Sequence, residues 1–195
     1  MKTNLNTRTM AIQTSLRLVV AGFCLVTAAA AQAESIALED FENDLAEAPA
    51  VKTGWESKSG EFSSASMQRS TTDVKRGAGA GEIKFDVKPG SWALVQKKYE
   101  GAEWLKRGPK AISFWLRASG AGKMTVELEE SYTFKWRKDV PLTDTTWHFV
   151  KINLKEFQCD DKRDMSSADL VDVKFVFYAG TGKIFLDDIQ FEFEE

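Results

Sequence analysis

The sequence contains few of the residues from which catalytic and metal centres are usually built. It has one histidine, His148, and two cysteines, Cys24 and Cys159, among 195 residues. A zinc site needs several His or Cys ligands, and a serine hydrolase needs both a histidine and a nucleophile motif such as Gly-x-Ser-x-Gly, which is missing. The glycines of 77–81 lead into a strand pattern rather than a helix, which excludes a phosphate loop. We therefore predict no catalytic residues and no enzyme activity.

Long apolar runs are also missing, except near the start of the chain. The first 33 residues contain three cations and no acid, and the apolar run Leu18–Ala31 ends in Ala31-Gln32-Ala33. This is the pattern of a secretory signal peptide. A run of 14 residues is shorter than the roughly 20 that a membrane-spanning helix needs. We predict a signal peptide at 1–33 that is cleaved after Ala33, a single domain at 34–195, a periplasmic or secreted location, and no membrane anchor.

The predicted mature chain has no excess of positive charge. Removing the three cations of the signal peptide leaves 23 of the 26 Lys and Arg against 29 Asp and Glu, a net charge near −6. Such a surface repels phosphate backbones, so we expect no nucleic-acid partner and no anionic membrane. Cys159 is the one cysteine left, which excludes an internal disulfide. We expect a monomer, with a Cys159 disulfide between two copies as the alternative.

Apolar and polar residues alternate with a period of two, about once in every ten residues. Ile83, Phe85 and Val87, for example, alternate with acidic or basic neighbours. This alternation is typical of strands in a sandwich or barrel. No segment of ten or more residues in 34–195 has a helical period, and 158–169 reads as a long polar loop. We predict an all-β fold, a two-sheet β-sandwich, with further strands at 112–116, 124–128, 171–177 and 185–193.

Four motifs, taken in order, carry a resemblance to a known family. They are Leu38-Glu39-Asp40-Phe41-Glu42, Ala111-Ile112-Ser113-Phe114-Trp115-Leu116, Thr146-Trp147 with Lys151-Ile152-Asn153-Leu154, and Gly182-Lys183-Ile184-Phe185-Leu186-Asp187-Asp188-Ile189. Together they resemble the galactose-binding-like jelly rolls, especially family 11 carbohydrate-binding modules, over nearly all of 34–195. The layout also looks like the complex I intermediate-associated protein 30 domain. The resemblance implies a jelly roll.

The resemblance further implies a structural calcium ion between the first and last strands. Asp187 lies two positions from both Phe185 and Ile189 on one predicted strand, so its carboxylate is expected on the same inward face. A buried carboxylate requires a cation or several hydrogen-bond donors. We expect Asp187 to bind calcium together with acids near the first strand and before Gly77. The alternative is that Asp187 accepts hydrogen bonds from backbone amides. The other candidate ligands are Asp40, Glu42 and Asp73.

The alternation of side chains along the predicted strands also predicts a ligand-binding face. Sugar rings pack on aromatic side chains while their hydroxyl groups bond to polar neighbours. If the strands around 115, 127 and 174 adjoin, one face carries aromatic rings and both signs of charge; the alternative is an ordinary solvated face. The predicted cleft residues are Trp115, Tyr178, Arg117, Glu127, Glu129 and Lys174.

The family pattern is not followed at every position of the sugar site. Family 11 modules place tyrosines on their sugar-binding surface, whereas this chain has Lys58 and Ser91 where the two sequences are comparable. The β-glucan specificity of the family therefore does not carry over. Two functions remain: a non-catalytic protein that binds a polysaccharide or oligosaccharide and holds calcium, or an assembly factor that binds a protein partner and no sugar.

Glu127 and Glu129 also admit a catalytic interpretation. Their Cα atoms, two residues apart on one strand, are about 6.8 Å apart, and glycosidases use carboxylate pairs at such separations. Acids at this spacing are common on any solvated sheet face, so we predict binding rather than hydrolysis. Tyr132, Phe134 and Trp136 alternate with polar or basic residues, and we expect these three to face the core rather than to form a second aromatic ridge.

Overall fold

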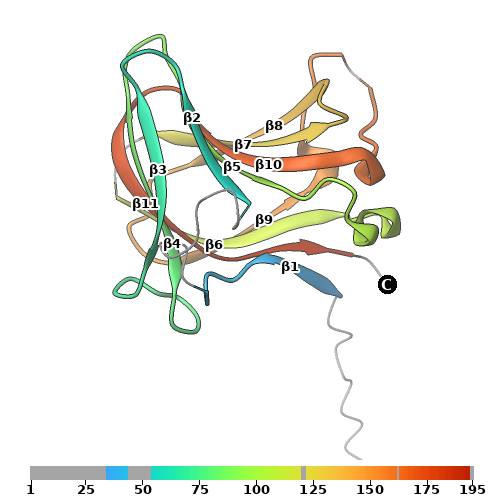
Figure 1. The fold of residues 1–195 in the computed structure, drawn as a ribbon, viewed down its shortest axis with the longest axis horizontal. Helices are drawn as coiled ribbons and strands as arrows, with labels where there is room; N and C mark the ends of the chain where they lie inside the picture. The colour runs from blue at the N-terminus through green and yellow to red at the C-terminus, as the bar shows by residue number, and fades with distance from the viewer. Residues whose placement is uncertain (1–33, 44–53, 120–121, 162, 194–195) are drawn as a thin grey trace, which may run out of the picture. The chain divides into compact units, whose positions relative to one another are not determined.

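The computed structural model describes residues 34–43, 54–119, 122–161 and 163–193. The predicted signal peptide and its cleavage site lie outside these residues. The described part consists of strands, short 3-10 helices and loops, as the alternation predicts (Figure 1). Within this part, no helix is long and apolar enough to cross a membrane.

The first sheet has six strands. β3, β4, β11, β6 and β9 are hydrogen-bonded in that order, and β1 pairs with the far end of β11. All strand pairs in the described part of the two sheets are antiparallel; Leu186, for example, lies opposite Leu116. The strands are β1 (Ser35–Glu39), β3 (Ser64–Ser70), β4 (Ala80–Val87), β6 (Ala111–Ser119), β9 (His148–Asn153) and β11 (Gly180–Glu192).

The second sheet has five strands in the order β2-β5-β10-β7-β8. They are β2 (Trp55–Ser59), β5 (Ala93–Lys98), β7 (Lys123–Glu130), β8 (Phe134–Pro141) and β10 (Leu170–Phe177). β10 is central and is buried along its whole length. The predicted neighbours β7 and β10 do adjoin, with Glu127 opposite Lys174. β6 belongs to the other sheet, so the prediction that all three strands form one face is wrong.

The core lies between the two sheets. Phe114 of β6 meets Phe175 of β10 edge to face, with ring centroids 5.7 Å apart. Phe85 of β4 stacks on Phe177 of β10 at 4.1 Å. These contacts join one sheet to the other, as expected where two inner faces interdigitate. The predicted two-sheet sandwich is therefore confirmed, and so is the inward direction of these alternating residues.

A bulge in β11 changes the predicted direction of its side chains. The register with β6 shifts between Asp187 and Gln190, and Asp188 has a φ of 52°, in the left-handed region. An inserted residue reverses the alternation. Ile184 joins the core before the bulge and Ile189 joins it after. Asp187 does share its face with Phe185, but this is the outward face, so the prediction that Asp187 points inward with Ile189 is wrong.

Helical structure in the described part is limited to single turns. η2 (Leu154–Glu156) follows β9, and the polar segment 158–169 contains η3 (Ser167–Asp169). The third, η1 (Glu103–Arg107), follows β5. Cys159 lies half-buried against the core.

Candidate ligand-binding face

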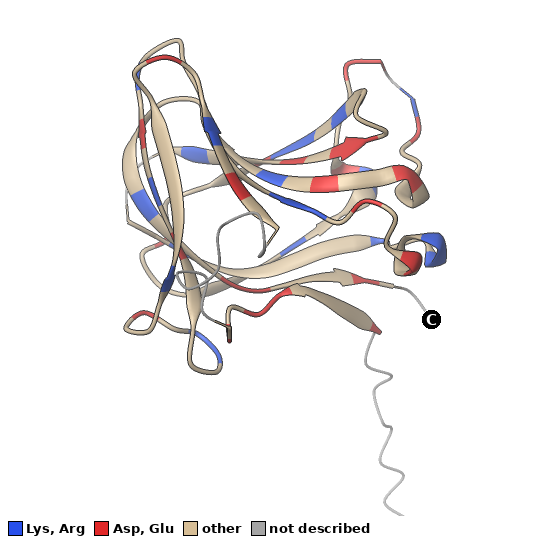
Figure 2. Cartoon of the chain, viewed as in Figure 1, with Lys and Arg blue, Asp and Glu red and all other residues tan. Residues whose placement is uncertain are grey.

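The outward side of the five-stranded sheet carries polar side chains from four adjacent strands. We call this surface the polar face. It arises because alternate residues of β5, β7, β8 and β10 point away from the core. Figure 2 shows both signs of charge along these strands. Its central residues are Gln96, Glu127, Glu129, Arg137, Asp172 and Lys174.

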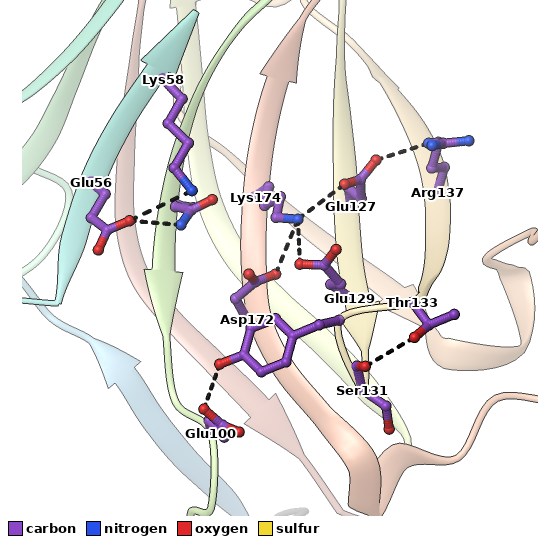
Figure 3. A network of polar contacts seen from close by, with 12 residues as sticks. Glu56, Lys58, Glu100, Glu127, Glu129, Ser131, Thr133, Arg137, Asp172 and Lys174 are labelled. Atoms are coloured by element: carbon purple, nitrogen blue, oxygen red, sulfur yellow. Dashed lines mark hydrogen bonds and ion pairs between the residues drawn. The ribbon is translucent and has the colours of Figure 1, made fainter.

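Lys174 is the centre of the polar face. Its Nζ lies 2.7 Å from Glu129 Oε2, 3.3 Å from Glu127 Oε1 and 3.6 Å from Asp172 Oδ1. Figure 3 shows the ammonium group among the three carboxylates, which come from β7 and β10. Lys174 is 5% exposed and Asp172 is 1% exposed. A buried ammonium group held by three acids has a fixed position, so the face is rigid before any ligand arrives.

Neighbouring strands extend this network on both sides. Arg137 of β8 donates from Nε to Glu127 Oε2 at 2.8 Å. On the other side, Gln96 of β5 donates from Nε2 to Glu56 Oε2 at 2.9 Å. Each side chain therefore uses part of its hydrogen-bonding capacity within the protein.

Burial and the neighbouring charges shift the pKa values at the centre. Burial raises the pKa of Asp172 to about 7; Lys174 opposes this shift, and the Glu129 carboxylate adds to it. Burial also acts to raise the pKa of Glu129, but its bond to Lys174 outweighs this, and the pKa is lowered. The pKa of Lys174 is raised, because its carboxylate partners outweigh burial. The ammonium group thus stays charged while Asp172 exchanges its proton near neutral pH.

Exposed aromatic side chains stand at both ends of the polar face. Trp92 is 39% exposed and Tyr178 is 45% exposed. They adjoin the pair formed by Ala93 and Phe177, so they share one end. Tyr132, which is 53% exposed, follows β7 at the other end and donates from its hydroxyl group to Glu100. β10 has eight residues, so the two ends are roughly 24 Å apart at about 3.4 Å per residue.

Sequence reasoning did not place Trp92 and Tyr132 beside the polar face. Tyr132 was expected to face the core with Trp136, and Trp136 is indeed buried. Ser131 and Tyr132 have φ values of 52° and 57°, a left-handed turn that breaks the alternation before β8 begins. Trp92 lies two residues after the Pro89-Gly90 turn, and no strand pattern covers it. Strand alternation does not apply to a turn residue, so only the structure shows where its side chain points.

Trp115 and Arg117 lie on the outward side of the other sheet, away from the polar face. Lys75 Nζ lies 4.1 Å from the centre of the Trp115 ring. Arg117 pairs with Asp73 and donates from Nε to the carbonyl oxygen of Thr145 at 3.1 Å. The six predicted cleft residues therefore form two groups, and four of them, Glu127, Glu129, Lys174 and Tyr178, belong to the polar face or its edge.

The four predicted calcium ligands surround the 70–79 loop, but each has its own partners. Glu42 accepts from the backbone of Ala78 at 3.0 Å, and Asp40 accepts from the backbone of Glu42 at 3.1 Å. Asp73 pairs with Arg117. No group of three or more His, Cys, Asp or Glu in the described ranges is arranged to hold a metal ion.

Asp187 has a different environment from the other three acids. Its Oδ2 accepts from the backbone amides of Arg76 at 2.8 Å and Lys75 at 3.0 Å. Its Oδ1 is buried and has no hydrogen-bond partner among the described atoms. Burial raises the pKa of this carboxyl group, although the amides act against the shift. Among the described atoms of the four acids, Asp187 Oδ1 is therefore the buried oxygen without a hydrogen-bond partner.

The fold is similar to that of solved carbohydrate-binding modules. The family 11 module of a cellulosomal cellulase of Clostridium thermocellum is 17% identical, with a TM-score of 0.67 over 84% of this chain and 96% of that chain. The same organism's family 11 module in complex with a β-1,3-1,4-mixed-linked tetrasaccharide has a TM-score of 0.66 at 18% identity, over 80% and 94%. A family 30 module from that organism has a TM-score of 0.58 at 14% identity, over 73% and 92%.

These structures confirm the predicted jelly roll. No protein-family model matches the chain, and no curated protein matches it either. Because the sequence identities are below one fifth, the similarity shows the fold and does not identify a ligand.

Proposed function

We propose that this protein binds carbohydrate without catalysing a reaction and that the polar face is its binding surface. The observation that carries the proposal is the position of Trp92 and Tyr178, exposed at the edge of a rigid hydrogen-bonding surface. Aromatic rings pack against the C–H faces of sugars, and fixed polar groups bond to their hydroxyl groups. The similarity to modules that include one solved with a tetrasaccharide supports this assignment.

The dimensions of the face favour a chain of sugars over a single unit. Aromatic side chains stand at its two ends, roughly 24 Å apart for an eight-residue strand at about 3.4 Å per residue. A ligand that contacts Tyr178 and Tyr132 together must span this length. The ligand is therefore an oligosaccharide or polysaccharide that lies along β10.

The acids of the face are better suited to binding than to hydrolysis. A glycosidase needs a protonated acid that can reach the glycosidic oxygen. Asp172 is the acid whose pKa is raised to about 7, but it is 1% exposed. Glu127 and Glu129 are both held by Lys174. Their carboxylates hold Lys174 and, through Glu127, Arg137 in place.

Affinity electrophoresis with soluble glucans, mannans and galactans tests this function. Retardation by at least one polysaccharide is expected, and a glycan array with and without calcium then identifies the sugar. Retardation by none of them, together with co-purification of a defined protein partner, would instead support the second function.

The second function is that of an assembly factor on the same scaffold. Phe149 is 49% exposed on the outward side of the six-stranded sheet, with its ring 5.3 Å from that of Trp115. An exposed aromatic ring that packs on a half-buried one is typical of protein interfaces. Crosslinking followed by mass spectrometry would place a protein partner on this side rather than on the polar face.

We also propose that the chain is exported and that it holds calcium. Export rests on the signal-peptide pattern, and the protein recovered outside the cytoplasm should have the mass of residues 34–195. Calcium rests on Asp187, whose buried Oδ1 is unsatisfied. Calcium is bound by oxygen ligands of this type, together with backbone carbonyl groups.

A further inference from the structure

A cavity of about 460 Å³ lies apart from the polar face, at one end of the sandwich. This volume is within the range of small-molecule sites, roughly 300–1,000 Å³. Four segments contribute to its wall: the approach to β6, the middle of β8, the end of β9 with η2, and the loop before η3. The residues that matter here are Lys110, Trp136, Leu154, Lys155, Phe157 and Arg163.

One part of the wall is apolar and fixed in place. Trp136, Leu154 and Phe157 are all buried members of the core. Trp136 donates from Nε1 to Glu130 Oε2 at 3.0 Å. The same carboxylate accepts from the backbone of Ser166 at 3.1 Å. Glu130 is 2% exposed, so it ties the loop before η3 to β8 and keeps the cavity formed without a ligand.

The remaining wall is mainly cationic. Lys110, Lys155 and Arg163 contribute to the lining, against one acid, Asp164. Arg163 is already paired with Glu130 at 3.0 Å. Within the ranges that the structure describes, Lys110 and Lys155 form no ion pair. Two ammonium groups that form no ion pair in the described ranges therefore lie beside the preformed apolar wall.

We propose that this cavity binds a small organic anion with a flat apolar body, such as an aromatic carboxylate or sulfonate. The apolar body packs against Trp136, Leu154 and Phe157, and the anionic group lies near Lys110 and Lys155. Charge complementarity selects the anion, and the buried wall selects the apolar body. A neutral glycan has neither feature, so this site is independent of the polar face.

Fluorescence titration with 8-anilinonaphthalene-1-sulfonate tests the proposal, because this probe combines one sulfonate with a flat apolar body. Saturable binding of one probe per chain is expected. The double variant Lys110→Gln/Lys155→Gln should raise the dissociation constant about tenfold or more. N-phenyl-1-naphthylamine, which has the same body without the sulfonate, should bind equally weakly to both proteins.

A second double variant controls for the loss of two charges. Lys75→Gln/Lys135→Gln makes the same change outside the cavity and should leave the dissociation constant within about twofold. Equal probe affinity in the two double variants would overturn the proposal, as would wild-type binding of the neutral probe with the affinity of the sulfonate. Thermal melts of each variant show that probe binding reports the folded protein, since this dye also binds loosened states.

Discussion

Asp187 of β11 lies directly opposite Trp115 of β6, and each carries a buried polar atom without a partner. The atoms are Asp187 Oδ1 and Trp115 Nε1. One is an acceptor and the other is a donor, so a water that bridges the two atoms would satisfy both. A calcium ion at the carboxylate satisfies Asp187 alone. A bridging water and a calcium ion are therefore the two explanations of why the Asp187 carboxylate is buried beneath the 70–79 loop. The partner of Trp115 Nε1 distinguishes between them.

Removal of calcium is expected to destabilise the protein. Treatment with EDTA should lower the melting temperature, and an excess of calcium should restore it, because a ligand that binds the folded state alone adds to its stability. Asp187→Asn should abolish this response, whereas Asp161→Asn, at an exposed position, should keep it. Differential scanning calorimetry makes the measurement. An unchanged melting temperature in the wild type would leave backbone amides and water as the partners of Asp187.

Aromatic substitutions should identify which sheet binds the glycan. Trp92→Ala and Tyr178→Ala should each weaken binding about tenfold or more, equivalent to about 1.4 kcal/mol, because aromatic contacts dominate such interfaces. Trp115→Ala is the matched control, since Trp115 lies on the other sheet. Isothermal titration with the best polysaccharide from the screen gives the affinities. Loss of binding in Trp115→Ala alone would move the site to the six-stranded sheet.

Lys174 should be one of the most sensitive positions for stability. Lys174→Met leaves three acids around an apolar side chain, and removing one partner of a buried ion pair costs about 3–5 kcal/mol. Lys138→Met is the comparison, because Lys138 forms an exposed pair with Glu156 at 3.0 Å, and such pairs contribute at most about 1 kcal/mol. Urea denaturation gives both free energies of unfolding. Equal losses in the two variants would contradict the buried network.

The raised pKa of Asp172 should make the stability of the protein depend on pH. Its pKa is raised to about 7 in the folded chain, mainly by burial, against about 3.9 in an unfolded chain. Folding therefore takes up a proton between about pH 4 and pH 7, and the contribution of Asp172 to stability is full below this window and falls as the pH rises through it.

Asp172→Asn isolates this effect. Asparagine is neutral at every pH, so the free energy of unfolding of the variant should rise relative to wild type from pH 4 to pH 8. Asp161→Asn, at an exposed position, should show no such trend. A difference between Asp172→Asn and wild type that stays constant across this range would show that Asp172 is ionised throughout.

Parity predicted the face of most residues but not the sheet to which they belong. Glu127 and Lys174 were expected on one outward face, and they lie opposite each other on β7 and β10. Trp115 was expected beside them and lies in the other sheet. Alternation is a property of one strand, whereas strand order depends on long-range pairing that a period-two pattern does not encode.

The sequence by itself determined the strand-rich sandwich, the inward direction of residues such as Phe114 and Phe175, and most acids and bases of the polar face. These follow from local alternation, because a strand turns successive side chains to opposite sides. The tertiary structure alone decided that Trp92 and Tyr178 meet at one end, that the bulge at Asp188 reverses β11, and that a cavity forms beside Trp136. Each of these depends on which distant segments come together, and only the packed chain settles that.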